Sequence, residues 1–154
     1  MRWVLRSKIH KAVVTDANVD YIGSITIDEE LVEKAGLWPG EKVLVVSNSS
    51  GARLETYVLV GERNSGVICI NGAAAHLIKA GEEIIVMGFE LADTPLTSTV
   101  ILVDHNNTLL ISNCRSKFLY LVKQHPAVHT SIPESQLSAK DAVPDRDRRT
   151  DRSS

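Results

Sequence analysis

The stretch "DYIGSITIDEE", residues 20–30, sets the local fold. Its segment Ser24–Ile27 is rich in isoleucine and threonine, which is typical of a short β-strand. Asp28 is a favourable helix N-cap, and the two glutamates after it suit a first helical turn because carboxylates interact well with the positive end of a helix. Gly36 suits a C-terminal stop. The stretch therefore predicts a short strand that leads directly into one short helix.

Short apolar runs rich in Val, Ile, Leu and Thr continue along the chain to residue 113, and turn signals such as Pro39-Gly40 and Asn71-Gly72 separate them. This pattern predicts a mainly β fold, a barrel or sandwich, with a second helical turn after Asn71-Gly72. The expected strands cover residues 3–15, 24–27, 42–48, 53–61, 66–71, 82–91, 98–104 and 108–113.

Composition narrows the class of protein. A chain of 154 residues with 44% hydrophobic content can form one domain with its own core. A net charge of -2 provides no general attraction to nucleic acid or anionic lipid, so the expected partner is a small molecule. No apolar run is long enough for a signal peptide or a membrane span, which predicts a soluble cytoplasmic protein. Cys69 and Cys114 lie far apart without CxxC spacing and indicate no disulfide framework.

The domain organisation follows from a change in composition. Residues 1–115 are expected to form the single folded domain, and residues 116–130 a C-terminal segment of uncertain structure. Residues 131–154 contain few apolar side chains, two prolines and interleaved charges, which predicts a disordered tail.

Common catalytic motifs are absent from the sequence. The chain lacks GxGxxG and GxxxxGK[ST] phosphate loops and a GxSxG nucleophile elbow. Its five histidines show no metal-ligand spacing, so no metal is expected.

The pair Gly23-Ser24 allows two interpretations. The first is a turn before the strand, and a chain of this size contains about one Gly-Ser pair by chance. The second is self-cleavage, because the Ser24 hydroxyl can attack the preceding carbonyl carbon in a strained turn, and glycine leaves that approach open. From the pair alone, the turn is the default.

Further motifs in order along the chain favour the second interpretation. They are "SKIHKAVVT" (7–15), "YIGSITID" (21–28), "GARLETY" (51–57), "GERNSGVICINGAAAH" (61–76) and "GEEIIV" (81–86). Together they resemble the aspartate 1-decarboxylase family of pyruvoyl-dependent enzymes over residues 2–105. The resemblance implies a six-stranded double-psi β-barrel with small helices, assembled as a homotetramer with active sites between subunits.

The resemblance also implies a reaction. Autocatalytic cleavage between Gly23 and Ser24 would yield a β chain, 1–23, and an α chain, 24–154, that begins with a pyruvoyl group formed from Ser24. L-Aspartate would form a Schiff base with this ketone, lose CO2 and leave as β-alanine for pantothenate and coenzyme A biosynthesis. Neither metal nor PLP is implied, because the conjugated pyruvoyl group accepts the electrons itself.

The matched positions imply roles for side chains that bind or protonate substrate. Tyr57 matches the proton donor, while Lys8 and Arg53 match contacts to the two substrate carboxylates. Arg53 lies four residues before Tyr57, so in a regular strand both point to one face. Thr56 matches a residue that assists cleavage and contacts substrate. In an ideal strand Thr56 points away from Tyr57, so a bulge or twist would be needed for both to serve one site.

The run "NGAA", residues 71–74, carries small side chains, so its main-chain N–H groups can approach a carboxylate closely. Here Gly72, Ala73 and Ala74 are implied to bind substrate. The resemblance implies supporting or processing roles for three further side chains: Asn71, His10 and Tyr21.

Two departures from the family pattern are Asp20, where histidine is common, and Asn64, where glycine is common. Two alternatives stay open: a pyruvoyl-dependent decarboxylase of another acidic amino acid, and a non-catalytic double-psi barrel. Cleavage could be spontaneous or assisted by a maturation factor.

Overall fold

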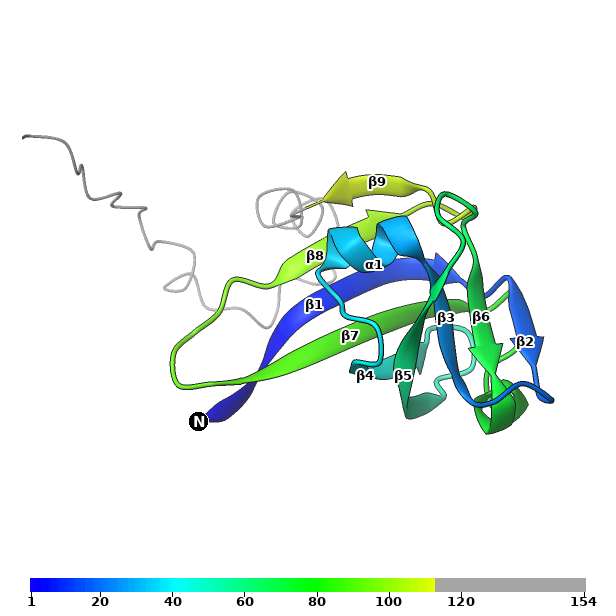
Figure 1. Ribbon diagram of the computed structural model, residues 1–154, viewed down its shortest axis with the longest axis horizontal. Helices are drawn as coiled ribbons and strands as arrows, with labels where there is room; N and C mark the ends of the chain where they lie inside the picture. Colours follow the sequence, from blue (N-terminus) through cyan, green and yellow to red (C-terminus); the bar gives the residue numbers. More distant parts are fainter. Residues whose placement is uncertain (113–154) are drawn as a thin grey trace, which may run out of the picture. The chain divides into compact units, whose positions relative to one another are not determined.

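The computed structural model describes residues 1–112, which form strands and two short helical segments (Figure 1). The mainly β prediction is confirmed. Within the described residues the elements are β1 (Arg2–Val13), β2 (Asp16–Asn18), β3 (Ser24–Asp28), α1 (Glu29–Ala35), β4 (Lys42–Ser47), β5 (Arg53–Gly61), β6 (Ile68–Asn71), the 3₁₀ helix η1 (Gly72–His76), β7 (Glu83–Ala92), β8 (Thr99–Val103) and β9 (Leu109–Ser112). Neither helical segment of residues 1–112 is long and apolar enough to cross a membrane.

The strands form one mixed sheet in the order β2-β6-β3-β5-β4-β7-β1-β8-β9. The parallel pairs are β1 with β8, β2 with β6, and β3 with β5. A parallel pair needs a crossover connection, and the chain from β3 to β5 passes through α1 and β4. The crossover leaves β3 between β5 and β6, so the start of β3 has a neighbouring strand on each side.

The helix α1 forms where its capping residues predict it. The Asp28 carboxylate accepts a hydrogen bond from Glu30 N at 2.8 Å, and Gly36 ends the helix in the left-handed region at φ +69°. The same carboxylate accepts bonds from Asn64 N at 3.1 Å and Gly66 N at 2.8 Å. Asp28 therefore caps the helix and also anchors the loop between β5 and β6.

The two faces of the sheet differ in burial. Ile9, Val86 and Val45 lie in register on neighbouring strands and are fully buried in the core. Lys8, the residue before Ile9 on β1, begins a row of paired residues that crosses β7 and β4 and ends at Glu55 on β5. Because side chains alternate along a strand, this row points to the face opposite Ile9. We call the face that carries Lys8 and Glu55 the outer face.

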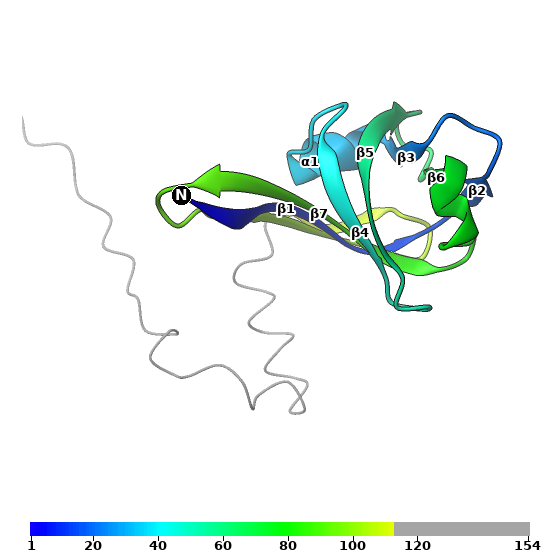
Figure 2. The same cartoon turned by 90° about the horizontal axis from the view of Figure 1, so that it is seen from below.

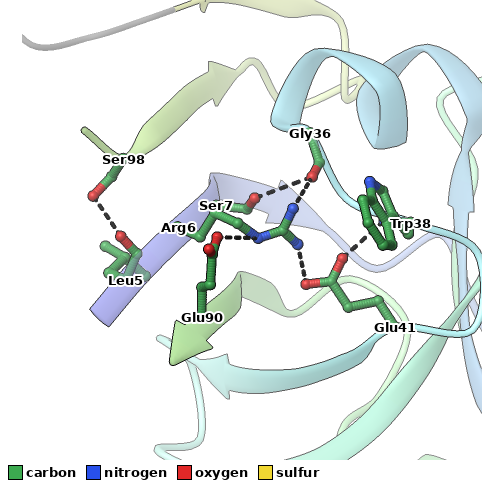
Figure 3. A network of polar contacts seen from close by, with 8 residues as sticks. All are labelled: Leu5, Arg6, Ser7, Gly36, Trp38, Glu41, Glu90 and Ser98. Carbon is green, nitrogen blue, oxygen red and sulfur yellow. Dashed lines mark hydrogen bonds and ion pairs between the residues drawn. The ribbon is translucent and has the colours of Figure 1, made fainter. Parts of the chain in front are cut away.

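Arg6 on β1 ties several segments together (Figure 3). Its Nη1 donates to the carbonyl oxygen of Gly36 at 2.8 Å, and its guanidinium forms an ion pair with Glu41. Glu90 on β7 lies 4.0 Å from Nε, and the guanidinium carbon is 5.8 Å from the centre of the Trp38 ring, within cation–π range. These contacts hold the end of α1 and the turn before β4 against β1 and β7.

The paired ends of β1 (residues 2–5) and β7 (residues 89–92) form a two-stranded ribbon that extends beyond β4 (Figure 2). We call it the terminal ribbon. β8 pairs with β1, and β4 with β7, only beyond this segment, so within the described residues no third strand pairs with the terminal ribbon, and the Leu5 carbonyl oxygen accepts a hydrogen bond from Ser98 Oγ at 2.7 Å. Its register places four apolar side chains on one face, and Trp3 and Leu91 are 72% and 45% exposed. The four are Trp3, Leu5, Phe89 and Leu91.

The structure differs from the sequence-based expectation at β2. Asp16–Asn18 contains no β-branched or aromatic residue, and it is a strand because β6 supplies its hydrogen-bond partners. The six-stranded double-psi topology stays a prediction. The expected segments 116–130 and 131–154 lie outside the described residues.

Candidate functional site

Ser24 is the first residue of β3 and adopts an unusual backbone conformation. Its φ is +129°, a region that L-residues rarely occupy, and its exposed fraction is only 2%. A Cβ built on the preceding Gly23 would meet no atom of the described residues within 4 Å, so packing there does not require glycine. The Gly23-Ser24 link therefore combines local strain on the serine side with open space on the glycine side.

Asn71 holds the Ser24 hydroxyl from the neighbouring strand. The two residues are paired across β3 and β6. Asn71 Nδ2 donates to Ser24 Oγ at 3.0 Å and to Thr26 Oγ1 at 2.9 Å, while Cys69 Sγ donates to Asn71 Oδ1 at 3.2 Å. The Asn71 residue is only 3% exposed, so its buried amide is satisfied at both ends.

Gly72 packs directly against the chain that precedes Ser24. It adopts φ +64°, and a Cβ at this position would lie 2.7 Å from Gly23 Cα, 2.8 Å from Gly23 N and 3.0 Å from the Tyr21 carbonyl oxygen. Only glycine fits both the backbone angle and this contact without a shift. Gly72 thus fixes the path of residues 21–23.

Substituting Gly72→Ala is expected to destabilise the chain by about 2–4 kcal/mol, since it adds a backbone penalty and an overpacked contact. Gly51→Ala is the matched control, because Gly51 has φ +76° but a Cβ there would meet nothing within 4 Å. That control should cost only about 1 kcal/mol. Thermal unfolding of both variants measures the difference, and equal losses would contradict the contact.

Tyr57 and Arg53 lie on β5, next to β3. Ile25 is paired with Val58, so Ser24 and Tyr57 each lie one residue before a paired position on adjacent parallel strands. Along β5 the exposed residues alternate with less exposed ones, and Arg53 shares the exposed face with Tyr57. The predicted common face for Arg53 and Tyr57 is confirmed.

Thr56 points the other way. The pairing of β4 with β5 runs from Lys42 with Tyr57 to Val46 with Arg53 without a register shift. Thr56 therefore faces the side opposite Tyr57, and this strand pair contains no bulge that would turn both side chains to one site.

Lys8 and His10 lie on β1, which is separated from β3 by β7, β4 and β5. The row that joins Lys8 to Glu55 crosses three strand spacings, about 14 Å along the sheet. Lys8 shares the outer face with Glu55, but the sheet order does not bring it against Ser24 within one chain. The sequence-predicted residues thus form two groups, one around Ser24 and one on β1.

Burial and nearby charges both shift the pKa of His10. Partial burial lowers its pKa, Lys8 and Lys11 lower it further, and Glu83 opposes them. Burial also lowers the pKa of Lys8. His10 Nδ1 is buried and has no hydrogen-bond partner among the described residues. His10 is therefore neutral at neutral pH.

Substituting Lys8→Gln is expected to raise the pKa of His10, although burial should keep it below the ordinary value of 6.5. Because folding lowers this pKa, the unfolded chain binds the proton more readily, and the contribution of His10 to stability falls as the pH drops from about 6.5 through the folded pKa. The variant should show a weaker fall in Tm over that range. NMR titration of the His10 ring measures the pKa, with His10→Gln for assignment.

The control for that titration is Lys34→Gln, on the exposed last turn of α1. Lys34 does not act on the His10 pKa, so its removal should leave the titration unchanged. A shift as large as that of Lys8→Gln would contradict the local charge effect.

The remaining predicted residues flank the Ser24 group. Tyr21 is 52% exposed, and its carbonyl oxygen faces Gly72. Ala73 is exposed and Ala74 partly buried on η1, directly after Asn71. Within residues 1–112, no three His, Cys, Asp or Glu side chains are grouped to hold a metal ion.

Sequence reasoning missed Thr26 and Cys69 as neighbours of the site. Thr26 lies two positions after Ser24 on β3, and Cys69 lies two positions before Asn71 on β6. Because β3 and β6 are paired in this register, all four side chains share one face. The signal that could have found them is this spacing of two, but it is readable only once the pairing of β3 with β6 is known.

Comparison with known proteins assigns the family. The aspartate decarboxylase family model matches residues 1–110. Aspartate 1-decarboxylase of Bacillus pumilus is 44% identical over 82% of this chain and 95% of its own length. The enzyme of the same name from Caldicellulosiruptor saccharolyticus is 50% identical over 71% of this chain and 90% of its own length. The chain belongs to the aspartate decarboxylase family.

Proposed function

We propose that this protein decarboxylates L-aspartate to β-alanine and CO2, and that the β-alanine supplies pantothenate and coenzyme A biosynthesis. The observation that carries the assignment is the family match over residues 1–110, which includes the strained Ser24. The high identity to curated aspartate 1-decarboxylases over most of their length supports the same reaction.

Maturation would start at Ser24. Its Oγ attacks the Gly23 carbonyl carbon, the C–N bond breaks, and the product is an ester with a free amine at residue 24. Loss of the Ser24 Cα proton then breaks the Cβ–Oγ bond, which leaves a Gly23 carboxylate and a dehydroalanine. Tautomerisation to the imine and hydrolysis release ammonia and leave the pyruvoyl ketone.

Three features of the site suit this sequence of steps. The positive φ of Ser24 stores strain that bond cleavage can release. Asn71 Nδ2 donates to the oxygen that departs as the Gly23 carboxylate. Glycine at position 23 places no side chain beside the carbonyl carbon that Ser24 Oγ would attack.

Substrate would bind through residues around the matured Ser24. The pyruvoyl group supplies a ketone that captures the substrate amine and accepts electrons when CO2 leaves. Tyr57, on the strand beside Ser24, would donate the proton to the substrate carbon. Arg53 would hold one carboxylate and Lys8 the other, while main-chain N–H groups of residues 72–74 assist.

The proposed assembly is a cytoplasmic homotetramer of six-stranded double-psi barrels with sites between subunits. Lys8 is set apart from Ser24 by three strands in one chain, which favours its delivery from a second copy. The apolar face of the terminal ribbon also suits a second copy, because a two-stranded ribbon is marginal without a partner. Thr56, which faces away from Tyr57, would act in cleavage only after a local change or from the interior side.

Intact-mass measurement and substrate assays test the proposal. The expected result is two fragments, residues 1–23 and 24–154, the second with a pyruvoyl start, together with β-alanine formation from aspartate. Competition between aspartate and glutamate distinguishes the alternative that another acidic amino acid is the substrate. One uncleaved chain that never converts aspartate would support a non-catalytic barrel instead.

A further inference from the structure

The side-chain amide of Asn71, on β6, forms a hydrogen bond with Ser24 Oγ. The effect of Asn71 on that oxygen depends on the orientation of the amide. In the observed orientation Nδ2 faces Ser24 Oγ, and Oδ1 faces Cys69 Sγ. A rotation of the amide by 180° would turn an acceptor toward the oxygen that must leave as a carboxylate. The groups that hold the Asn71 amide in one orientation therefore determine whether Ser24 Oγ faces a donor or an acceptor.

Two neighbours hold the amide, one at each end. Thr26 Oγ1 accepts the second Nδ2 proton at 2.9 Å, and the Cys69 thiol donates to Oδ1 at 3.2 Å. The thiol lies farther, 3.9 Å, from the Ile70 carbonyl oxygen, so the amide is its nearer acceptor. Thr26 and Cys69 are paired across β3 and β6, directly beside the pair formed by Ser24 and Asn71.

The protonation state of Cys69 suits a donor. Partial burial raises the pKa of its thiol, the Asp16 carboxylate raises it further, and a backbone hydrogen bond from Asn18 opposes them. The thiol therefore keeps its proton at neutral pH. The protonated thiol can donate to Asn71 Oδ1, and the donor that faces Ser24 Oγ is still the amide Nδ2.

We propose that Cys69 and Thr26 are positioning residues for self-cleavage, which lock the Asn71 amide so that Nδ2 donates to Ser24 Oγ. This inference rests on the proposed cleavage at Gly23-Ser24 and adds two residues to it. The donor stabilises negative charge on Oγ when the Cβ–Oγ bond breaks, so the lock lowers the barrier to elimination. Within the described residues, the side-chain hydrogen bonds of Cys69 and Thr26 at this site go to the Asn71 amide and not to Ser24, so both residues act through Asn71.

The test measures the cleavage rate of freshly synthesised full-length chain by intact mass over time, with Tm measured in parallel. Cys69→Ala and Thr26→Val each remove one partner of the amide, and each should slow cleavage about tenfold, the effect of one lost hydrogen bond in the transition state. Thr26→Val keeps the β-branched shape, so the packing of the strand changes little.

Matched variants separate positioning from stability. Cys69→Ser keeps a donor and Thr26→Ser keeps an acceptor, so both should cleave within about twofold of the wild-type rate. Asn71→Ala, which removes the amide itself, should be slower than any of them. Rescue by the two serine variants is the readout that a purely structural role would not produce.

The outcomes are distinguishable from failure of the proposed function. If the wild-type chain never cleaves, the proposed function fails. If the wild type cleaves and Cys69→Ala and Thr26→Val cleave equally fast, only the positioning role is overturned. It is also overturned if the serine variants are as slow as Cys69→Ala and Thr26→Val, or if every rate simply follows Tm.

Discussion

The Ser24→Ala variant is expected to remain a single full-length chain with no aspartate decarboxylase activity. Without the hydroxyl, no atom can attack the Gly23 carbonyl carbon, and no pyruvoyl group can form. The expected loss is complete, because the missing group is both the nucleophile of maturation and the precursor of the prosthetic group. Intact-mass analysis detects the uncleaved chain, and release of CO2 from labelled aspartate measures activity.

Ser47→Ala is the matched control for this variant. Ser47 and Ser24 are both 2% exposed, so each substitution removes a buried hydroxyl, but Ser47 lies on β4 and bonds to Glu82. The Ser47 variant should lose stability and still cleave and turn over. Activity in Ser24→Ala, or loss of cleavage in both variants, would overturn the assigned role of Ser24.

Tyr57→Phe is expected to separate maturation from turnover. The variant should cleave at Gly23-Ser24 like the wild type, since no hydrogen bond joins Tyr57 to Ser24 or Asn71 within the described residues. Its kcat for aspartate should fall by about 100-fold to 10,000-fold, because the substrate carbon loses its positioned acid. KM should change much less, since Arg53 and Lys8 would still bind the carboxylates.

The measurements are steady-state kinetics on fully cleaved protein, with the cleaved fraction determined by mass. Ser50→Ala removes a hydroxyl that donates to Glu82 Oε2 at 2.8 Å, away from β3 and β6, and should leave kcat unchanged. A Tyr57→Phe enzyme with wild-type kcat would show that the proton comes from elsewhere.

Short sequence patterns predicted those features that depend on contacts between residues close together in the chain. The helix α1 follows from the Asp28 cap and the Gly36 stop, because each satisfies backbone groups of its own helix turn. Arg53 and Tyr57 share a face because side chains of a strand alternate, whatever its partners. The Gly23-Ser24 pair alone predicts a turn, and it became a candidate cleavage site because the motifs along residues 7–86 resemble those of one family.

Features that depend on strand pairing could not be predicted. The segment β2 lacks strand propensity and exists because β6 is beside it. The direction of Thr56 depends on whether β5 is bulged, and its pairing with β4 shows a regular register. A register is set by hydrogen bonds between segments far apart in the chain, and a shift by one residue would turn every side chain to the other face.

The sequence by itself determined the strand-rich class, the short capped helix, the candidate cleavage pair and the family resemblance, because these depend on residue types and short spacings. Only the tertiary structure decided that Asn71 lies opposite Ser24, that Cys69 and Thr26 hold its amide, and that Gly72 rests on Gly23. It also separated Lys8 on β1 from Ser24 on β3 by the three strands β7, β4 and β5. The reason is physical: contacts between residues about 45 positions apart form only after the crossover from β3 through α1 and β4 has placed β3 between β5 and β6.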